Sequence, residues 1–157
     1  MKIVKLSSLI VLIILAFSCS SSEEDSLSSN SIVGTWKPIA EVGVCSTGKE
    51  DVSVYNSCEQ ESRYIFKLHN NQSLETDGTL TGTKKTLENG ECEIYSSGKI
   101  STWSLKDGVF TVDNEIVTFF ELESNVFRAG SYDNDPNDPC DGGNLPSHYY
   151  TEFVRAN

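Results

Sequence analysis

The sequence is poor in basic residues and in long apolar runs, and each shortage excludes a class of protein. Lys and Arg total 12 against 23 Asp and Glu, which gives a formal net charge of −11 at pH 7. The basic residues stand singly except for Lys84 and Lys85. Because proteins that bind nucleic acid place clustered Lys and Arg on phosphates, no nucleic-acid partner is expected. The longest apolar stretch, near the N-terminus, is too short to span a bilayer.

Catalytic signatures are also missing. The sequence has no nucleophile elbow around a serine, no phosphate-binding loop, no dinucleotide fingerprint and no paired-histidine metal motif. Its 2 histidines, His69 and His148, fall at an expected hairpin and at the start of the expected last strand. Solvated or hydrogen-bonded roles are ordinary for histidines in such places. We therefore expect a protein that is not an enzyme.

The N-terminus has the pattern of an export signal. Met1 to Lys5 is short and basic, Leu6 to Phe17 is dominated by apolar residues, and Ser18 leads directly into Cys19. This stretch resembles the lipobox of bacterial lipoproteins, with Phe17 where a smaller residue is commoner. The resemblance implies that residues 1–18 are a cleaved signal peptide and that Cys19 carries the lipid, with palmitate among its acyl chains. An ordinary secretory signal and an uncleaved anchor are the alternatives.

Residues 19–31 indicate a flexible acidic tether after the lipidated cysteine. The segment is rich in Ser, poor in apolar residues and contains Glu23, Glu24 and Asp25. Such a segment reaches about 20 Å on average. Its acidic part resembles the signal that sends some lipoproteins to the outer face of the outer membrane. We expect a cell-envelope protein that its lipid anchors in the outer membrane and that is exposed at the surface, with residues 32–157 as the folded domain.

The rest of the sequence predicts an all-β domain. Hydrophobic residues make up 38% of the chain, and no segment keeps a helical period. Alternation of apolar and polar residues between turn signals predicts eight strands. They are Val33–Val42, Glu61–His69, Gln72–Lys84, Lys99–Lys106, Val109–Val112, Glu115–Leu122, Val126–Ser131 and Ser147–Arg155. The connections that suit tight hairpins are Asn70-Asn71, Asp107-Gly108, Asp113-Asn114 and Ser124-Asn125.

The alternation within these strands also predicts the core and the closure of the sheet. An antiparallel up-and-down meander of eight strands closes naturally into a small barrel, which removes the exposed sheet edges. Gly78 suggests a bulge in the third strand, and Pro38, which has no N–H, suggests a break or bulge in the first. The side chains expected to point inward are Tyr64, Phe66, Leu68, Trp103, Leu105, Ile116, Phe120 and Leu122.

The remaining cysteines predict two disulfides. Besides Cys19, the chain has Cys45, Cys58, Cys92 and Cys140, an even number in an oxidising compartment, and three pairings are possible. If the barrel closes, the first strand lies beside the last and all of these cysteines fall at one end. Cys45 paired with Cys140 would then join the closing seam, and Cys58 paired with Cys92 would bracket the second hairpin.

Several short motifs resemble lipocalin-like domains of bacterial envelope lipoproteins. They are Gly34-Thr35-Trp36, the segment from Gly98 through Leu105 with the Asp-Gly hairpin after it, and the closing Tyr149 to Arg155. The resemblance covers roughly Ser31 to Asn157 and implies a lipocalin-like barrel in which Trp36 plugs the closed end and Arg155 packs over its ring. A cation over an aromatic face contributes about 1 kcal/mol. A solvated Arg155 beside a core Trp36 is the alternative.

One loop resembles the start of an EF-hand or thrombospondin-type calcium loop. Its alternate oxygen-bearing side chains could wrap a hard cation such as Ca²⁺. Asp138 stands where the sharp-turn glycine is expected, and no Glu follows at the twelfth position. We therefore expect an ordinary surface loop, with a structural Ca²⁺ site as the alternative and no other cofactor. The candidate ligands are Asp133, Asp135, Asn137 and Asp141.

These patterns support two hypotheses for function. The first is a non-catalytic binding module that holds a small apolar ligand inside a membrane-anchored barrel. The second is an envelope interaction protein with a solid core, whose disulfide-stapled acidic loops contact a protein or a glycan. Inward-pointing Phe66, Trp103 and Phe120 favour a solid interior at mid-height. In the second hypothesis the loop residues available as aromatic contacts are Tyr55, Tyr95 and Tyr132.

Overall fold

The computed structural model describes residues 31–69, 76–133, 143 and 145–156. They form an antiparallel β-sheet structure with one short 3-10 turn and no α-helix, so the predicted all-β class is confirmed. None of the described residues belongs to a helix long and apolar enough to cross a membrane. The elements are β1 (Gly34–Val44), β2 (Glu50–Val54), η2 (Glu59–Glu61), β3 (Arg63–Leu68), β4 (Asp77–Glu88), β5 (Glu91–Lys106), β6 (Val109–Val112), β7 (Glu115–Ile116), β8 (Phe119–Leu122), β9 (Val126–Tyr132) and β10 (His148–Arg155).

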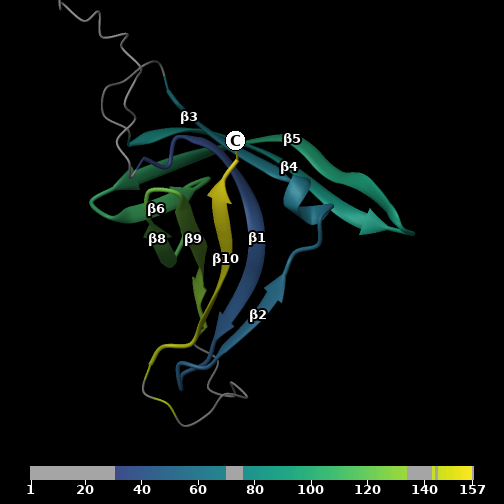
Figure 1. The fold of residues 1–157 in the computed structure, drawn as a ribbon. Helices are drawn as coiled ribbons and strands as arrows, with labels where there is room; N and C mark the ends of the chain where they lie inside the picture. Colours follow the sequence, from purple (N-terminus) through teal and green to yellow (C-terminus); the bar gives the residue numbers. More distant parts are fainter. Residues whose placement is uncertain (1–30, 70–75, 134–142, 144, 157) are drawn as a thin grey trace, which may run out of the picture.

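The sheet has ten strands in the order β7-β6-β5-β4-β3-β1-β10-β9-β8, with β2 paired to β1 alone (Figure 1). The first strand lies beside the last, as expected if the barrel closed. The prediction of eight strands closed into a barrel is wrong, because the sheet ends at β7 and β8 without a hydrogen-bonded ladder between them. Residues 115–122 form two strands instead of one: β7 pairs with β6, and β8 pairs with β9. Val117 and Thr118 carry the chain from one sheet edge to the other.

The turn residues determine where several hairpins lie. Asp107-Gly108 and Asp113-Asn114 have positive φ at both positions, as tight hairpins of this kind require, so these two predicted turns are confirmed. Asn89-Gly90 also has positive φ and joins β4 to β5. The loop predicted between Lys84 and Lys99 is therefore wrong, and Asn89-Gly90 is the turn signal that the prediction lacked. The two strands instead continue to the turn and form a long arm (Figure 1).

The two expected irregularities have different outcomes. The register of β1 against β10 shifts between Pro38 and Ala40, so the bulge expected at Pro38 is confirmed. The bulge expected at Gly78 is wrong, because Gly78 pairs regularly with Leu68 and Trp103. Gly78 is needed for space, since a Cβ there would lie 1.8 Å from the Lys67 carbonyl oxygen.

Aromatic rings fill the interior of the curved sheet. The centre of the Phe66 ring lies 5.9 Å from that of Trp103 and 5.7 Å from that of Phe127. The ring centres of Trp36 and Phe127 are 4.9 Å apart, and all three pairs have edge-to-face geometry. Most of the predicted inward residues belong to this cluster. Ile116 does not, because the chain breaks strand geometry after β7; it is 64% exposed, and Val117 packs inward instead. The largest members of the buried cluster are Trp36, Phe66, Trp103, Phe110 and Phe127.

Arg155 and Trp36 make the contact that the lipocalin resemblance implies. The guanidinium carbon lies 4.4 Å from the centre of the Trp36 ring. Arg155 also donates hydrogen bonds from Nη1 to the Val33 carbonyl and from Nη2 to the Ser31 carbonyl. These bonds hold the first described residues against the end of the last strand, so the chain enters the domain at the start of β1.

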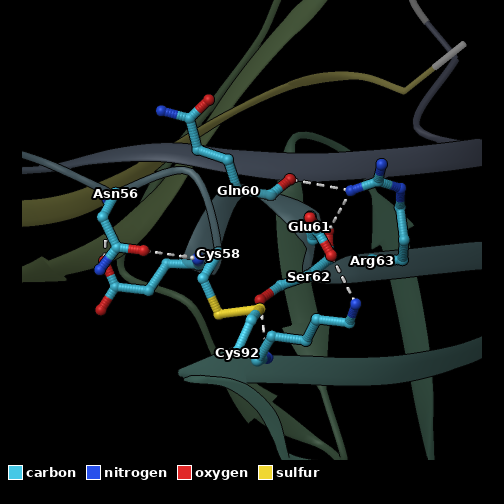
Figure 2. Close-up of a disulfide and its surroundings, with 9 residues drawn as sticks. Asn56, Cys58, Gln60, Glu61, Ser62, Arg63 and Cys92 are labelled. Atoms are coloured by element: carbon cyan, nitrogen blue, oxygen red, sulfur yellow. Dashed lines mark hydrogen bonds and ion pairs between the residues drawn. A yellow bond between two sulfur atoms is a disulfide. The ribbon is translucent and has the colours of Figure 1, made fainter. Parts of the chain in front are cut away.

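Cys58 and Cys92 form a disulfide with an S–S distance of 2.09 Å, which confirms one predicted pair. Figure 2 shows that it ties η2 to the β4–β5 arm. Cys92 lies inside β5 and not in a loop, because the arm is longer than expected. Cys140, the expected partner of Cys45, lies outside the described residues. Cys19 and the expected signal peptide and tether, up to residue 30, lie outside them as well.

Candidate functional site

The face of β2, β1, β10, β9 and β8 that points away from the aromatic core carries a groove. Directly paired residues lie on the same face of a sheet, so the ladders define this surface in rows. From β2 to β8 the rows are Val54, Ala40, Glu152, Arg128 and Glu121; then Val52, Val42, Tyr150, Gly130 and Phe119; then Glu50, Val44, His148 and Tyr132.

The bulge in β1 creates this surface. Before the bulge, Pro38 pairs with Phe153, which packs against the aromatic core. After it, Ala40 pairs with Glu152. Because consecutive strand residues point to opposite faces, Glu152 and Phe153 face away from each other. The one extra residue therefore turns the second half of β1 outward, so a single strand serves both the core and the groove.

The outer groove, as we call it, has a volume of about 460 Å³. Ala40 and Val42 form a small, buried floor and are each 6% exposed. The exposed strand β2 stands on one side, and aromatic and charged side chains of β10, β9 and β8 stand on the other. The lining residues are Ala40, Val42, Val44, Glu50, Val52, Phe119, Glu121, Arg128, His148, Tyr150 and Glu152.

Stacked rings form one wall of the outer groove. Phe119 stacks on His148 with ring centres 4.4 Å apart and on Tyr150 with ring centres 5.0 Å apart. Gly130 lies opposite both Phe119 and Tyr150 and has no side chain to separate them. A Cβ on Gly130 would lie 1.9 Å from the carbonyl oxygen of Tyr149, so only glycine fits there. Tyr132 packs edge-to-face on Phe119 and extends the stack.

An ion-pair network fixes the charged end of the groove. Arg128 donates from Nε to Glu152 at 2.7 Å and from Nη1 to Glu121 at 3.0 Å. Glu123 adds an ion pair to Nη1 at 3.7 Å. The hydrogen bond to Glu152 is the main cause that raises the pKa of Arg128, so the guanidinium stays charged. Its carbon lies 5.9 Å from the centre of the Tyr150 ring, which connects the network to the stack.

Some polar groups of the groove remain available to a ligand. Among the described residues, the Tyr150 hydroxyl, the Glu50 carboxylate and Nη2 of Arg128 have no hydrogen-bond partner. Burial is the main cause that raises the pKa of Tyr150, so its hydroxyl is a neutral donor and acceptor at physiological pH. The groove thus combines fixed rings with unused donors and acceptors.

The structure brings only part of the sequence-predicted set to this groove. His148 lines it and donates a hydrogen bond from Nδ1 to the Pro146 carbonyl oxygen at 3.1 Å, and Tyr132 borders it. Tyr55 hydrogen-bonds Glu41 on the opposite face of β1, and Tyr95, 73% exposed, lies on the β4–β5 arm. The sequence predictions did not include the central residues of the groove, although alternation along β10 already places Tyr150 and Glu152 on the face opposite Phe153. Those residues are Phe119, Arg128, Tyr150 and Glu152.

The expected calcium loop lies largely beyond the part of the chain that is described. Asp133 follows β9, whereas Asp135, Asn137 and Asp141 fall outside the described residues. Within residues 31–69, 76–133 and 145–156, no three His, Cys, Asp or Glu side chains are grouped as a metal site would need. Cys58 and Cys92, which form the observed disulfide, do not line the outer groove.

Comparison of the chain with known protein families, with curated proteins and with solved structures finds no match. Its function is therefore inferred from the outer groove and the filled core.

Proposed function

We propose that this protein is a lipid-anchored, non-catalytic binding module of the cell envelope that holds its ligand in the outer groove. The observation that carries the proposal is the contrast between the two faces of the sheet. The inner face is occupied by rings in mutual contact, and the outer face has a 460 Å³ groove with unused polar groups. Small-ligand sites are typically about 300–1,000 Å³ in volume.

This proposal favours the solid-core hypothesis over the apolar carrier. A carrier needs an empty interior, and the space between β1, β3, β6 and β9 is taken by Trp36, Phe66, Phe110 and Phe127. The lipocalin-like origin of the fold remains part of the proposal. It is supported by the pairing of the first strand with the last and by Arg155 over Trp36.

The position of the groove suits an anchored protein. The chain enters the domain at Ser31, beside Arg155, and strands rise about 3.3 Å per residue. The groove floor from Ala40 to Val44 therefore lies about 20–33 Å along β1 from its start. A lipid on Cys19 with a flexible tether would leave the groove pointing away from the membrane.

The anchor is tested with Cys19→Ala in the full chain. We expect the variant to lose incorporation of radiolabelled palmitate and to leave the membrane fraction, because the proposed lipid is its anchor and no helix among the described residues is long and apolar enough to cross a membrane. Ser20→Ala, next to the lipidated position, is the control and should keep both. A Cys19→Ala variant that still carries the label would contradict the lipoprotein assignment.

The binding site is tested with a photo-crosslinking benzoylphenylalanine in whole cells. Val52 lines the groove and is 50% exposed, whereas Val109 lies outside it and is 47% exposed, so the two positions are matched in access. We expect a discrete adduct from position 52 and none from position 109. Equal labelling at both positions would contradict the proposal that the groove is the binding site. A small apolar molecule released from the native protein by organic extraction would restore the carrier hypothesis.

A further inference from the structure

Resting on the proposed function, we propose that the ligand of the outer groove is a neutral oligosaccharide. The juxtaposition that supports this is a preformed aromatic wall beside fixed carboxylates and a guanidinium, all in one shallow, open groove. Sugars present apolar C–H faces and rows of hydroxyls. A site that recognises them therefore needs a ring to stack on and planar polar groups at its edge.

Tyr150 supplies the ring. The Phe119 ring lies 5.0 Å from the Tyr150 ring and is nearly parallel to it, the Arg128 guanidinium carbon lies 5.9 Å from the ring centre, and the small side chain of Val42 is the partner of Tyr150 on β1. A small neighbour on the β1 side leaves room for a ligand over the floor of the groove. Phe119 and the backbone ladder hold the ring in place before the ligand arrives, so little conformational entropy is lost on binding.

The polar groups around Tyr150 suit hydroxyls. Arg128 is held by Glu152 and Glu121, and each carboxylate oxygen has lone pairs beyond the one that the guanidinium uses. Glu50, on the opposite side of the groove, adds a carboxylate, and the Tyr150 hydroxyl can both donate and accept. Hydrogen bonds to charged groups contribute more than neutral ones, which favours directional recognition of neighbouring hydroxyls.

Charge complementarity selects an uncharged sugar chain. Three carboxylates and one guanidinium line the groove, and the whole chain has a net charge of −11. This field repels phosphates and acidic sugars. A basic peptide is the competing occupant, but Arg128 stands between Glu121 and Glu152 in the charged row and repels a cationic side chain that approaches either carboxylate. Its single positive charge offsets one of these two carboxylates, and both keep lone pairs that can accept hydrogen bonds from hydroxyls.

The test is an oligosaccharide array probed with the full-length lipidated protein in a polyoxyethylene detergent, which has no sugar headgroup. The array carries neutral hexasaccharides of glucose, mannose, xylose and N-acetylglucosamine, acidic oligogalacturonate as the anionic probe, and hexalysine as the basic peptide probe. We expect binding to at least one neutral sugar. Affinity for that sugar should fall at least about tenfold in Tyr150→Ala, because the stacking surface is lost. Tyr95→Ala, on the arm, is the matched control and should bind like the wild type.

A second variant keeps the test valid if Tyr150→Ala disturbs the fold. Glu50→Gln changes only an exposed carboxylate on β2 and should weaken binding several-fold while thermal unfolding stays unchanged. Neutral-sugar binding that neither variant weakens would overturn the groove as the sugar site. Binding only of hexalysine or oligogalacturonate, lost in Tyr150→Ala, would overturn the ligand class but leave the proposed function in place. Absence of any binding together with no adduct at position 52 would overturn both proposals.

Discussion

Phe127→Ala should lower the free energy of unfolding by about 4 kcal/mol, because truncating a fully buried phenylalanine costs about 3–5 kcal/mol. Phe127 is 2% exposed. Its ring stacks on Phe153 at 4.3 Å and meets Trp36 and Phe66 edge-on, so one substitution removes contacts with β10, β1 and β3. Since small domains have total stabilities of about 5–15 kcal/mol, the variant should be close to unfolding at 37 °C.

Urea unfolding followed by tryptophan fluorescence measures this effect, since Trp36 and Trp103 are both buried. Val109→Ala, at an exposed position of β6, is the control and should change stability by less than about 0.5 kcal/mol. A loss below about 1 kcal/mol for Phe127→Ala would mean that the interior is loosely filled. It would then have space for an apolar ligand, contrary to the proposed function.

The sequence predicted much of the fold because strand signals are local. Alternation placed β6 at its observed ends, and two of the predicted Asp and Asn turns have the expected positive φ. Pairing of the first strand with the last was expected only for a closed barrel, and it is observed although the sheet is open between β7 and β8. The prediction of a closed barrel was wrong because closure depends on how residues 115–122 divide between two partner strands, β6 and β9. The apolar pattern there, which continues through Val117, contains no signal of that division.

The candidate site was harder to predict, since it results from one inserted residue. Pro38 suggested a bulge, but the alternation after it looks like a continuation of the core face. The register shift reverses that face, so Ala40 and Val42 become the groove floor. Likewise β2 is short and every one of its residues is exposed, so its sequence gives only the brief alternation of Val52 and Val54; it forms because β1 offers a free edge beyond β3. Such effects depend on partners distant in sequence.

Replacing both Cys58 and Cys92 with Ala should lower the free energy of unfolding by about 3–4 kcal/mol. The disulfide closes a segment with a sequence separation of 34 residues, and loss of such a cross-link restores that much chain entropy to the unfolded state. The native fold should persist. Non-covalent contacts still join η2 to the arm: the Lys85 backbone N–H donates to Ser62 Oγ at 2.9 Å, and the Lys85 ammonium pairs with Glu61.

The double variant should lose stability locally in the β4–β5 arm as well as in the whole domain, because the arm has few other contacts near its turn. Hydrogen exchange at the arm tip, around Asn89 and Gly90, should accelerate in the double variant, while exchange in β1 and β10 stays slow. Wild-type protein treated with a reductant should show the same change at the arm tip, and the double variant should not change further there. Tyr95→Ala, on the same arm, should leave urea unfolding within about 0.5 kcal/mol of the wild type. If reduction leaves the arm as protected as before, the ladder between β4 and β5 alone orders it, and the disulfide is not what holds the arm against η2.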